Sequence, residues 1–299
     1  MSILLNIFGQ FWDKVTKPED EKRIATLSLP DGIKEINNIP YTDSGSEYHL
    51  LDVYYPEDAK GPLPVIIEIH GGGWMYGTKD LNKIYAQYLA KRGFVVFNLS
   101  YRLVPEVLVP DQLKDVALAI CKAKELMPTL PCDTSKIILT GDSAGGQLAS
   151  FTAALSRSAA LREHFGTADH GIDFSCVVLT SPVAYMNDEL PMGLYCRLMW
   201  GEKGRKKSSR KYMNIDELIN EVTDFPPTIL ITSSGDVLAL KQTRRLHSTL
   251  LEKGCDAELL DYPKFEGKDL PHVFACLEPY STAGALCIDR ICEFINKHI

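Results

Sequence analysis

The stretch that decides the fold is "GDSAGG", residues Gly141 to Gly146. Its serine, Ser143, has one glycine two positions before it and another two positions after it. Residues 136–142, "KIILTGD", have the apolar run of a buried strand, and residues 144–158, "AGGQLASFTAALSRS", are typical of a helix. A Gly-x-Ser-x-Gly turn between a strand and a helix is the pattern of a nucleophile elbow, in which small residues make room for a sharp turn. We therefore expect the Ser143 hydroxyl to point out at the carboxyl edge of a sheet.

Short apolar strands alternate with helical segments on both sides of this turn. Strands are predicted at residues 49–55, 64–70, 94–101, 136–142, 175–183, 228–236 and 257–263. Helices are predicted at residues 81–93, 110–126, 144–158, 242–254 and 282–298. This alternation predicts βαβ units, and hence an α/β fold with a mostly parallel central sheet flanked by helices. It is interrupted at about residues 184–221, which include the basic run "GEKGRKKSSRKY" (201–212), whose role stays open.

Composition narrows the possible partners of the 299-residue chain. Its net charge of -7 gives no basic footprint for nucleic acid, and no segment has the length and apolarity of a membrane span. The first residues, "MSILLNIFGQFWDKVTK", lack the basic start and the cleavage site of a signal peptide. Their helical spacing favours an amphipathic helix packed on the domain. The eight cysteines form no C-x-x-C pair, which favours free thiols in a reducing, cytoplasmic setting.

A serine nucleophile needs a base, and the base needs an orienting acid. In the α/β-hydrolase arrangement these partners follow the serine in the order acid, then histidine. His272, in "DLPHVF", comes between the last predicted strand and the last helix, and Asp236 ends the preceding strand, "TILITSSGD". We expect Ser143, Asp236 and His272 to form a catalytic triad. The nearby acids Asp261, Glu266 and Asp269 are competitors for the role of Asp236, ranked lower because they belong to the strand and loop of the base itself.

Attack on a carbonyl group places negative charge on its oxygen, which must meet hydrogen-bond donors already in position. "HGGGW", residues His70 to Trp74, follows the predicted strand 64–70 and exposes backbone N–H groups to a ligand. We expect Gly72 and Gly73 to act as oxyanion donors together with Ala144 of the elbow.

At this point the motifs "HGGGW", "YRLVPE" (101–106), "GDSAGG" and "GDVL" (235–238), followed by a late histidine, resemble those of the hormone-sensitive-lipase-like α/β-hydrolases. That resemblance covers about residues 50–299 and implies a cytosolic carboxylesterase or acetylesterase. It implies the same triad and oxyanion donors. It also implies one α/β-hydrolase domain, residues 1–299, with a helical cap built from about residues 1–24 and 184–221. The chain departs from the family with Val273 where glycine is usual after the histidine, and with Val237 where proline is usual after the acid.

The cap is expected to shape a small acyl pocket that favours acetyl to about butyryl esters. The predicted substrate contacts are Trp74, Leu198 and Met199, and no cofactor or metal ion is expected. Other bulky candidates in the two cap segments are Leu4, Phe8, Phe11, Trp12, Tyr185, Met192, Leu194, Tyr195 and Trp200.

Three alternatives to an esterase can be weighed from the sequence. A peptidase or amidase could use the same triad, and a ligand-binding module could use the same scaffold. Retention of His272 argues against the binding module, and the absence of an appended propeller-like domain favours esters over peptides. A nucleotide-binding P-loop at residues 72–79 is rejected because the segment ends Thr-Lys instead of Lys-Ser/Thr. The partner is thus a small-molecule ester of unknown identity, and the oligomeric state, a homodimer included, stays open.

Overall fold

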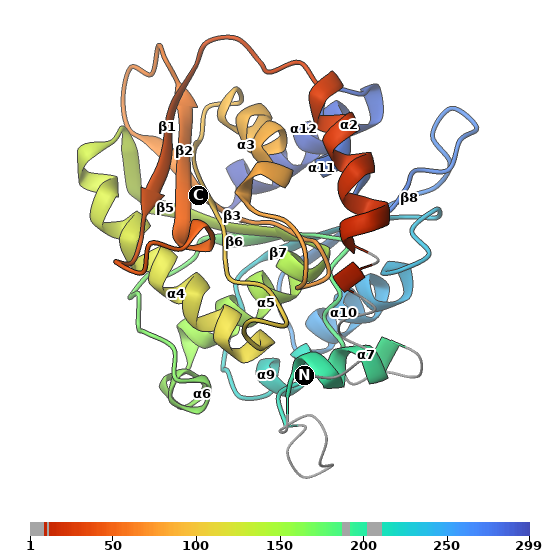
Figure 1. The fold of residues 1–299 in the computed structure, drawn as a ribbon. Coiled ribbons are helices and arrows are strands. Elements are labelled where there is room, and N and C mark those ends of the chain that lie inside the picture. Colours follow the sequence, from red (N-terminus) through yellow and green to blue (C-terminus); the bar gives the residue numbers. More distant parts are fainter. Residues whose placement is uncertain (1–8, 11, 187–191, 202–210) are drawn as a thin grey trace.

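The computed structural model describes residues 9–10, 12–186, 192–201 and 211–299 of the chain. In these residues eight strands form one sheet with the order β1-β2-β4-β3-β5-β6-β7-β8 (Figure 1). The pairs β1–β2 and β2–β4 are antiparallel, and all others are parallel. The strands are β1 (Ile33–Pro40), β2 (Leu50–Pro56), β3 (Leu63–Ile69), β4 (Val95–Leu99), β5 (Cys132–Asp142), β6 (Cys176–Thr180), β7 (Thr228–Ser233) and β8 (Ala257–Tyr262).

Helices cover both faces of the sheet (Figure 1). On one face α4, α5, α6, α9 and α10 supply the core residues, and on the other α3, α11 and α12 do so. Their bounds are α3 (Lys83–Ala90), α4 (Val109–Leu126), α5 (Ser143–Arg157), α6 (Ala159–Phe165), α9 (Ile215–Ile219), α10 (Leu240–Glu252), α11 (Phe274–Leu277) and α12 (Thr282–Lys297). The predicted α/β fold with a mostly parallel sheet flanked by helices is therefore confirmed.

The central strands are buried on both sides, which explains their continuous apolar sequences. In β3, Val65, Ile67 and Ile69 belong to one core cluster, whereas Ile66 belongs to the cluster across the sheet. The same alternation places Leu139 and Ile138 of β5 on opposite faces. Because side chains alternate along a strand, an apolar residue at every position is needed when both faces are covered.

The seven predicted strands are all present, but the edge strand β1 was not predicted. Its sequence, "IKEINNIP", mixes exposed and half-buried positions, and its pairing with β2 is interrupted between Ile36 and Ile39, where Asn38 has a φ of 61°. A polar edge strand with a bulge carries only a weak period-two pattern.

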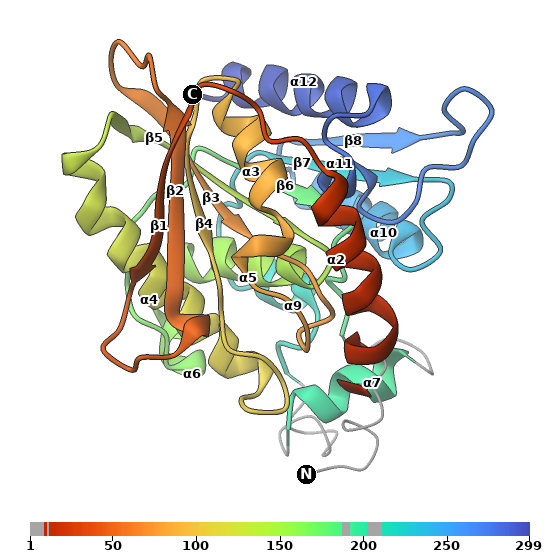
Figure 2. The same cartoon turned by 45° about the horizontal axis from the view of Figure 1, so that its top comes forward.

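Two further segments lie over the carboxyl edge of the sheet. After a short π-helix at Trp12–Thr16 comes α2 (Lys17–Thr26), and α7 (Met192–Met199) comes from the interruption of the α/β alternation. Figure 2 shows α2 running from the region of α11 to the region of α7. Arg23 of α2 donates a hydrogen bond to the carbonyl of Leu277 at the end of α11 (3.0 Å). Among the described residues, the helices are too short or too polar to cross a lipid bilayer.

Candidate active site

The turn between β5 and α5 places Ser143 at the first position of the helix, with a φ of 51°. A side chain on Gly145 would lie 2.0 Å from the Ile69 carbonyl oxygen, and one on Gly141 would lie 2.4 Å from the Gly145 carbonyl oxygen. Both distances are far below a van der Waals contact, so only glycine fits at these two positions. The small residues around Ser143 are thus required because the backbone at the start of α5 packs directly on the backbone at the end of β3.

His272 lies between Ser143 and Asp236. Its Nε2 is 2.9 Å from the Ser143 Oγ, and its Nδ1 is 2.8 Å from the Asp236 Oδ1. An ionised carboxylate can only accept hydrogen bonds, so Nδ1 carries the proton and Nε2 is left to accept the serine proton. The three residues predicted as a triad are therefore brought together by loops that follow β5, β7 and β8.

Asp236 is held rigidly on its other side. Its Oδ1 accepts the backbone N–H groups of Leu238 (3.1 Å) and Ala239 (2.9 Å), and its Oδ2 accepts the Thr232 hydroxyl (3.3 Å). Burial alone would raise the pKa of Asp236, but the hydrogen bond and charge of His272 outweigh burial and lower this pKa. Asp236 therefore stays ionised and fixes the orientation of the imidazole.

The competing acids are engaged elsewhere. Asp261 forms an ion pair with Arg244 (2.7 Å), and Asp269 lies 3.5 Å from the Lys264 ammonium. Glu266 is exposed on the loop after β8. His272 contacts Asp236 instead of any of these.

The "HGGGW" loop follows β3 directly, and where the oxyanion donors were predicted its backbone has positive φ angles that favour glycine. Gly72 has a φ of 103° and Gly73 a φ of 58°. The Gly72 carbonyl accepts the N–H groups of Met75 (3.1 Å) and Tyr76 (3.0 Å), which closes the loop into a tight turn. Ala144, in the first turn of α5, has a backbone N–H without an acceptor inside its own helix.

Both cap segments contact Gly73. The Trp12 ring lies 2.4 Å from where a Gly73 Cβ would be, and it stacks on Tyr76 with ring centroids 5.7 Å apart. From α7, the Tyr195 hydroxyl donates to the Gly73 carbonyl (3.1 Å), and it also hydrogen-bonds the Trp12 side chain. Trp12 and Tyr195, which the sequence offered as pocket walls, thus contact the "HGGGW" loop (residues 70–74).

The predicted substrate contacts need correction. Trp74 is only 2% exposed, and its indole N–H donates to Gln147 of α5 (3.0 Å). Met199 is fully buried in the core. Neither side chain presents a surface to a ligand, because both are enclosed in the same buried core cluster. Leu198 is partly buried and remains available for contact. Leu4, Phe8 and Phe11 lie outside the described residues, as do the side chains of Met192 and Leu194.

Comparison with known proteins places this geometry in a family. The BD-FAE family model matches residues 51–250, two thirds of the chain. The chain belongs to the BD-FAE family. In solved structures, esterase B from Lactobacillus rhamnosis superposes with a TM-score of 0.92 at 27% identity, over 99% of this chain and 96% of that one.

Curated relatives are similar over shorter stretches. The probable isoprenylcysteine alpha-carbonyl methylesterase ICMEL1 of Arabidopsis thaliana is 25% identical over 75% of this chain and 48% of its own length. The versiconal hemiacetal acetate esterase of Dothistroma septosporum is 33% identical over 44% of this chain and 42% of its own length. The chain thus spans about half the length, or less, of the curated relatives it matches. The expected membership among α/β-hydrolases related to hormone-sensitive lipase is confirmed at the level of family and fold.

In this BD-FAE chain the "YRLVPE" motif (101–106) contacts the "HGGGW" loop (70–74), where the oxyanion donors were predicted. The Tyr101 hydroxyl donates to the carbonyls of His70 (2.8 Å) and Gly71 (3.2 Å), and its ring stacks on His70. Next to it, Arg102 forms a two-pronged contact with the buried Asp115 (2.9 and 2.7 Å). Tyr101 therefore anchors the "HGGGW" loop by hydrogen bonds, and the ion pair of Arg102 with Asp115 ties the motif to α4.

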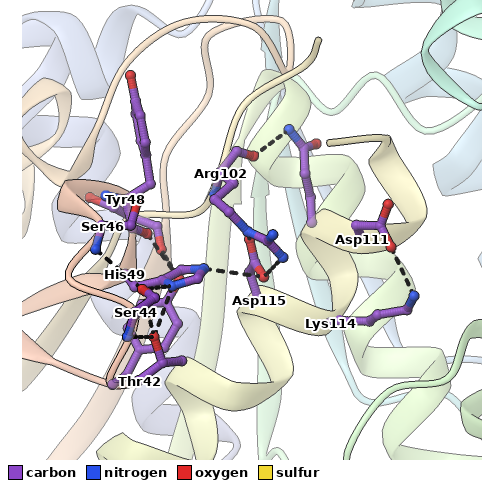
Figure 3. A network of polar contacts seen from close by, with 12 residues as sticks. Thr42, Ser44, Ser46, Tyr48, His49, Arg102, Asp111, Lys114 and Asp115 are labelled. Carbon is purple, nitrogen blue, oxygen red and sulfur yellow. Dashed lines mark hydrogen bonds and ion pairs between the residues drawn. The ribbon is translucent and has the colours of Figure 1, made fainter. Parts of the chain in front are cut away.

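A second serine–histidine–aspartate chain lies behind Arg102 (Figure 3). The Ser44 Oγ is 2.6 Å from the Nδ1 of His49, whose Nε2 is 3.5 Å from Asp115. Asp115 is already bound by Arg102, and His49 also contacts the Thr42 hydroxyl (2.8 Å). This network joins the loop before β2 to α4 and offers no strand-to-helix turn that would supply oxyanion donors.

Sequence reasoning missed a set of polar residues beneath the elbow. The Asp142 carboxylate accepts hydrogen bonds from the Gly71 N–H (2.8 Å) and from the Asn82 side-chain amide (2.6 Å). The same Asn82 amide also donates to Glu68 (2.7 Å). The sequence contained one indication of these buried polar residues, because Glu68 is a charged residue in the otherwise apolar strand "PVIIEIH".

Proposed function

We propose that this chain is a carboxylic ester hydrolase that uses Ser143 as nucleophile, His272 as general base and Asp236 as the orienting acid. The observation that carries the proposal is the continuous hydrogen-bond chain from Ser143 through His272 to Asp236 at a strained strand-to-helix turn. Its similarity to esterase B over nearly the whole chain supports the same reaction class.

In the acylation step the Ser143 Oγ attacks the ester carbonyl carbon while its proton passes to the Nε2 of His272. The carbonyl oxygen takes up the electron pair and becomes an oxyanion. When the tetrahedral intermediate collapses, the bond to the alkoxy oxygen breaks, and the imidazolium returns its proton to the leaving alcohol. Asp236 stabilises the imidazolium between these two transfers, since it remains ionised.

The oxyanion forms next to the first amide groups of α5. Ala144 supplies one backbone N–H there, and Gly72 and Gly73 supply donors from the loop after β3. Each donor of this kind contributes about a hundredfold in turnover. In the second half of the reaction a water molecule takes the place of the alcohol and attacks the acyl-enzyme carbonyl while His272 accepts its proton. When this intermediate collapses, the bond between the carbonyl carbon and the Ser143 Oγ breaks, the imidazolium returns the proton to Ser143, and the carboxylic acid leaves.

A short acyl chain is favoured by the cap. Trp12 and Tyr195 close over Gly73 beside the oxyanion loop, which leaves bulky side chains near the bound carbonyl. Esterase B has been crystallised with C4-C4 tributyrin phosphonate and C6-C4 inhibitors, so that protein accepts inhibitors with acyl chains of four carbons. We assign acetyl to about butyryl esters to this chain, with Leu198 as a contact of the acyl group.

A series of p-nitrophenyl esters from acetate to laurate tests this proposal. The expected result is the highest kcat/KM at acetate to butyrate and a steep loss for the longer chains, with no turnover in Ser143→Ala. Best turnover at laurate would contradict the short acyl pocket. Absence of turnover for every ester, with the protein folded by circular dichroism, would contradict the esterase and favour a ligand-binding module. A parallel series of p-nitroanilides detects amidase activity.

A further inference from the structure

Three polar side chains are buried directly behind the catalytic turn and take no part in the steps above. Glu68 is on β3, Asn82 precedes α3, and Asp142 is the last residue of β5, next to Ser143. Their exposed fractions are 0%, 6% and 5%. One amide nitrogen, the Asn82 Nδ2, donates both to the Glu68 Oε1 (2.7 Å) and to the Asp142 Oδ1 (2.6 Å). The amide group thus holds two buried carboxyl groups close together.

Two buried carboxyl groups at this separation do not both ionise, because like charges repel strongly where water is excluded. The hydrogen bonds decide which one carries the charge. Asp142 receives the Asn82 amide, the Gly71 N–H (2.8 Å) and its own backbone N–H. Glu68 receives only the Asn82 amide, and among the described residues its Oε2 has no hydrogen-bond partner. Donors stabilise an ionised carboxylate, so the charge resides on Asp142 and the proton on Glu68.

The groups around the two carboxyls also favour a proton on Glu68 and a negative charge on Asp142. Burial, and then the charge of Asp142, raise the pKa of Glu68 well above its usual 4.5. Burial also raises the pKa of Asp142, but Asn82, His272 and the Gly71 N–H oppose the increase. The other titratable groups that interact with this pair are Tyr85, Tyr101, His272 and Cys276.

Asp142 lies between the two halves of the oxyanion hole. It directly precedes Ser143 and Ala144, and its carboxylate binds the N–H of Gly71, which directly precedes Gly72. A side chain at position 71 would lie 2.4 Å from the Asp142 Oδ2, so glycine is required for this close approach. The charge also acts on His272, because the two groups interact electrostatically and the interaction is reciprocal.

We propose that Glu68, Asn82 and Asp142 form a positioning unit in which a proton held on Glu68 leaves Asp142 as a single fixed anion. This anion keeps the "HGGGW" loop in register with the elbow and stabilises the imidazolium of His272. The role in catalysis rests on the proposed esterase function, whereas the location of the charge does not depend on it.

The location of the proton is tested by stability, without any substrate. If folded Glu68 keeps its proton, the unfolded chain releases that proton as the pH rises above about 4.5. The folded state then binds more protons, so the free energy of unfolding of the wild type falls with rising pH relative to Glu68→Gln. Urea unfolding from about pH 5 to pH 8 should show that the free energy of unfolding of Glu68→Gln minus that of the wild type becomes steadily more positive, whatever its sign at pH 5. A signed difference that stays constant or becomes more negative as the pH rises would overturn the assignment.

The positioning role is tested by kinetics on the same esters. Asp142→Asn should lower kcat at least about tenfold with KM nearly unchanged, since transition-state contacts are lost and ground-state binding is not. It should also move the acidic limb of kcat/KM to lower pH, because the imidazolium loses a stabilising charge. Glu68→Gln should keep kcat within about threefold, since an amide replaces a neutral acid.

Asn82→Leu is a second test of the positioning role, because it removes the donor shared by the two carboxyls while keeping a similar side-chain volume. It should lower kcat about as much as Asp142→Asn does. Asp142→Asn with an unchanged kcat and an unchanged acidic limb of the kcat/KM pH profile would overturn the positioning role. A loss of kcat in Glu68→Gln as large as that in Asp142→Asn would overturn it too. A wild type without turnover would instead refute the proposed function, and the unfolding data would still decide where the charge lies.

Discussion

Three residues at the candidate site have a strained backbone, although strained residues such as Asn38 and Tyr212 also occur elsewhere. Ser143 and Val273 both have a φ of 51°, and Trp74 of the oxyanion loop has a φ of 64°. Such conformations cost about 1–3 kcal/mol each and persist only where the surrounding structure enforces them. Val273 is notable because related sequences usually have glycine there, whereas this chain keeps a β-branched residue in the left-handed region directly after His272. The position of the imidazole is therefore fixed by packing around Val273, which is largely buried.

The triad residues act as one unit, which makes a specific kinetic prediction. Ser143→Ala and His272→Ala should each reduce turnover by about three to six orders of magnitude. Asp236→Asn should cost somewhat less, because the nucleophile and the base remain. The double variant of Ser143 and His272 should be little worse than either single one. Initial rates with p-nitrophenyl butyrate measure this, and near-wild-type activity in His272→Ala would contradict the role of the base.

The glycines of the elbow are predicted to be needed for folding. Gly145→Ala places a methyl group 2.0 Å from the Ile69 carbonyl oxygen and 2.4 Å from that of His70, so either α5 or β3 must move. We expect a loss of about 3 kcal/mol in the free energy of unfolding, as for other severe steric changes. Gly61→Ala is the matched control, since a Cβ there has nothing within 4 Å. Equal urea midpoints for the two variants would show that the elbow is not tightly packed.

At the scale of elements, the "HGGGW" loop, which we propose to supply the oxyanion donors, is contacted by α7 and the N-terminal segment. Tyr195→Phe removes the hydrogen bond to the Gly73 carbonyl and leaves the ring in place. We expect kcat to fall about three- to tenfold with little change in KM, as for loss of one hydrogen bond that matters mainly in the transition state. Tyr185→Phe is the control, because its hydroxyl contacts Thr249 instead of the loop. A rise in KM alone would show that Tyr195 binds substrate and does not position the loop.

The elements that the sequence predicts well are those with a strong apolar pattern. The buried strands β3, β5 and β7 are continuous apolar runs, and the loops after them carry the glycine, serine and aspartate motifs. A helix was expected within the first 17 residues. Of these, residues 9–10 and 12–16 are helical, and residues 1–8 and 11 lie outside the described residues. The helical structure continues beyond the expected segment through α2, Lys17–Thr26, which has no buried residue. A helix with polar residues on all sides has no apolar stripe from which its position can be predicted.

Some features of the site depend on contacts that no local pattern encodes. Trp74 follows three glycines that suggested a ligand site, yet its ring is enclosed by packing against α5. The contacts of Trp12 and Tyr195 with Gly73 join residues 61 and 122 positions apart, and the Asn82 bridge joins three different elements. Sequence motifs thus predicted that Ser143, His272 and Asp236 come together, but they could not predict what holds these residues in place.

At the scale of the whole molecule, the N-terminal segment links both halves of the site. Trp12 packs on the oxyanion loop, and Arg23 binds the Leu277 carbonyl close to the loop that carries His272. Deleting residues 1–17 should change the ratio of acetate to hexanoate turnover or abolish activity, because Trp12 no longer covers Gly73. Circular dichroism should still report the α/β core. An unchanged chain-length profile in the truncated protein would contradict the cap role of this segment.

The most direct test of the central claim is covalent labelling with a fluorophosphonate followed by mass spectrometry of the labelled peptide. The phosphorus is attacked by an activated serine and by no ordinary hydroxyl group, so the reaction reports the nucleophile without assuming an ester. Our account predicts a single adduct on Ser143 in the wild type and greatly slowed labelling in His272→Ala. An unlabelled wild type, or an adduct that persists in Ser143→Ala, would contradict it.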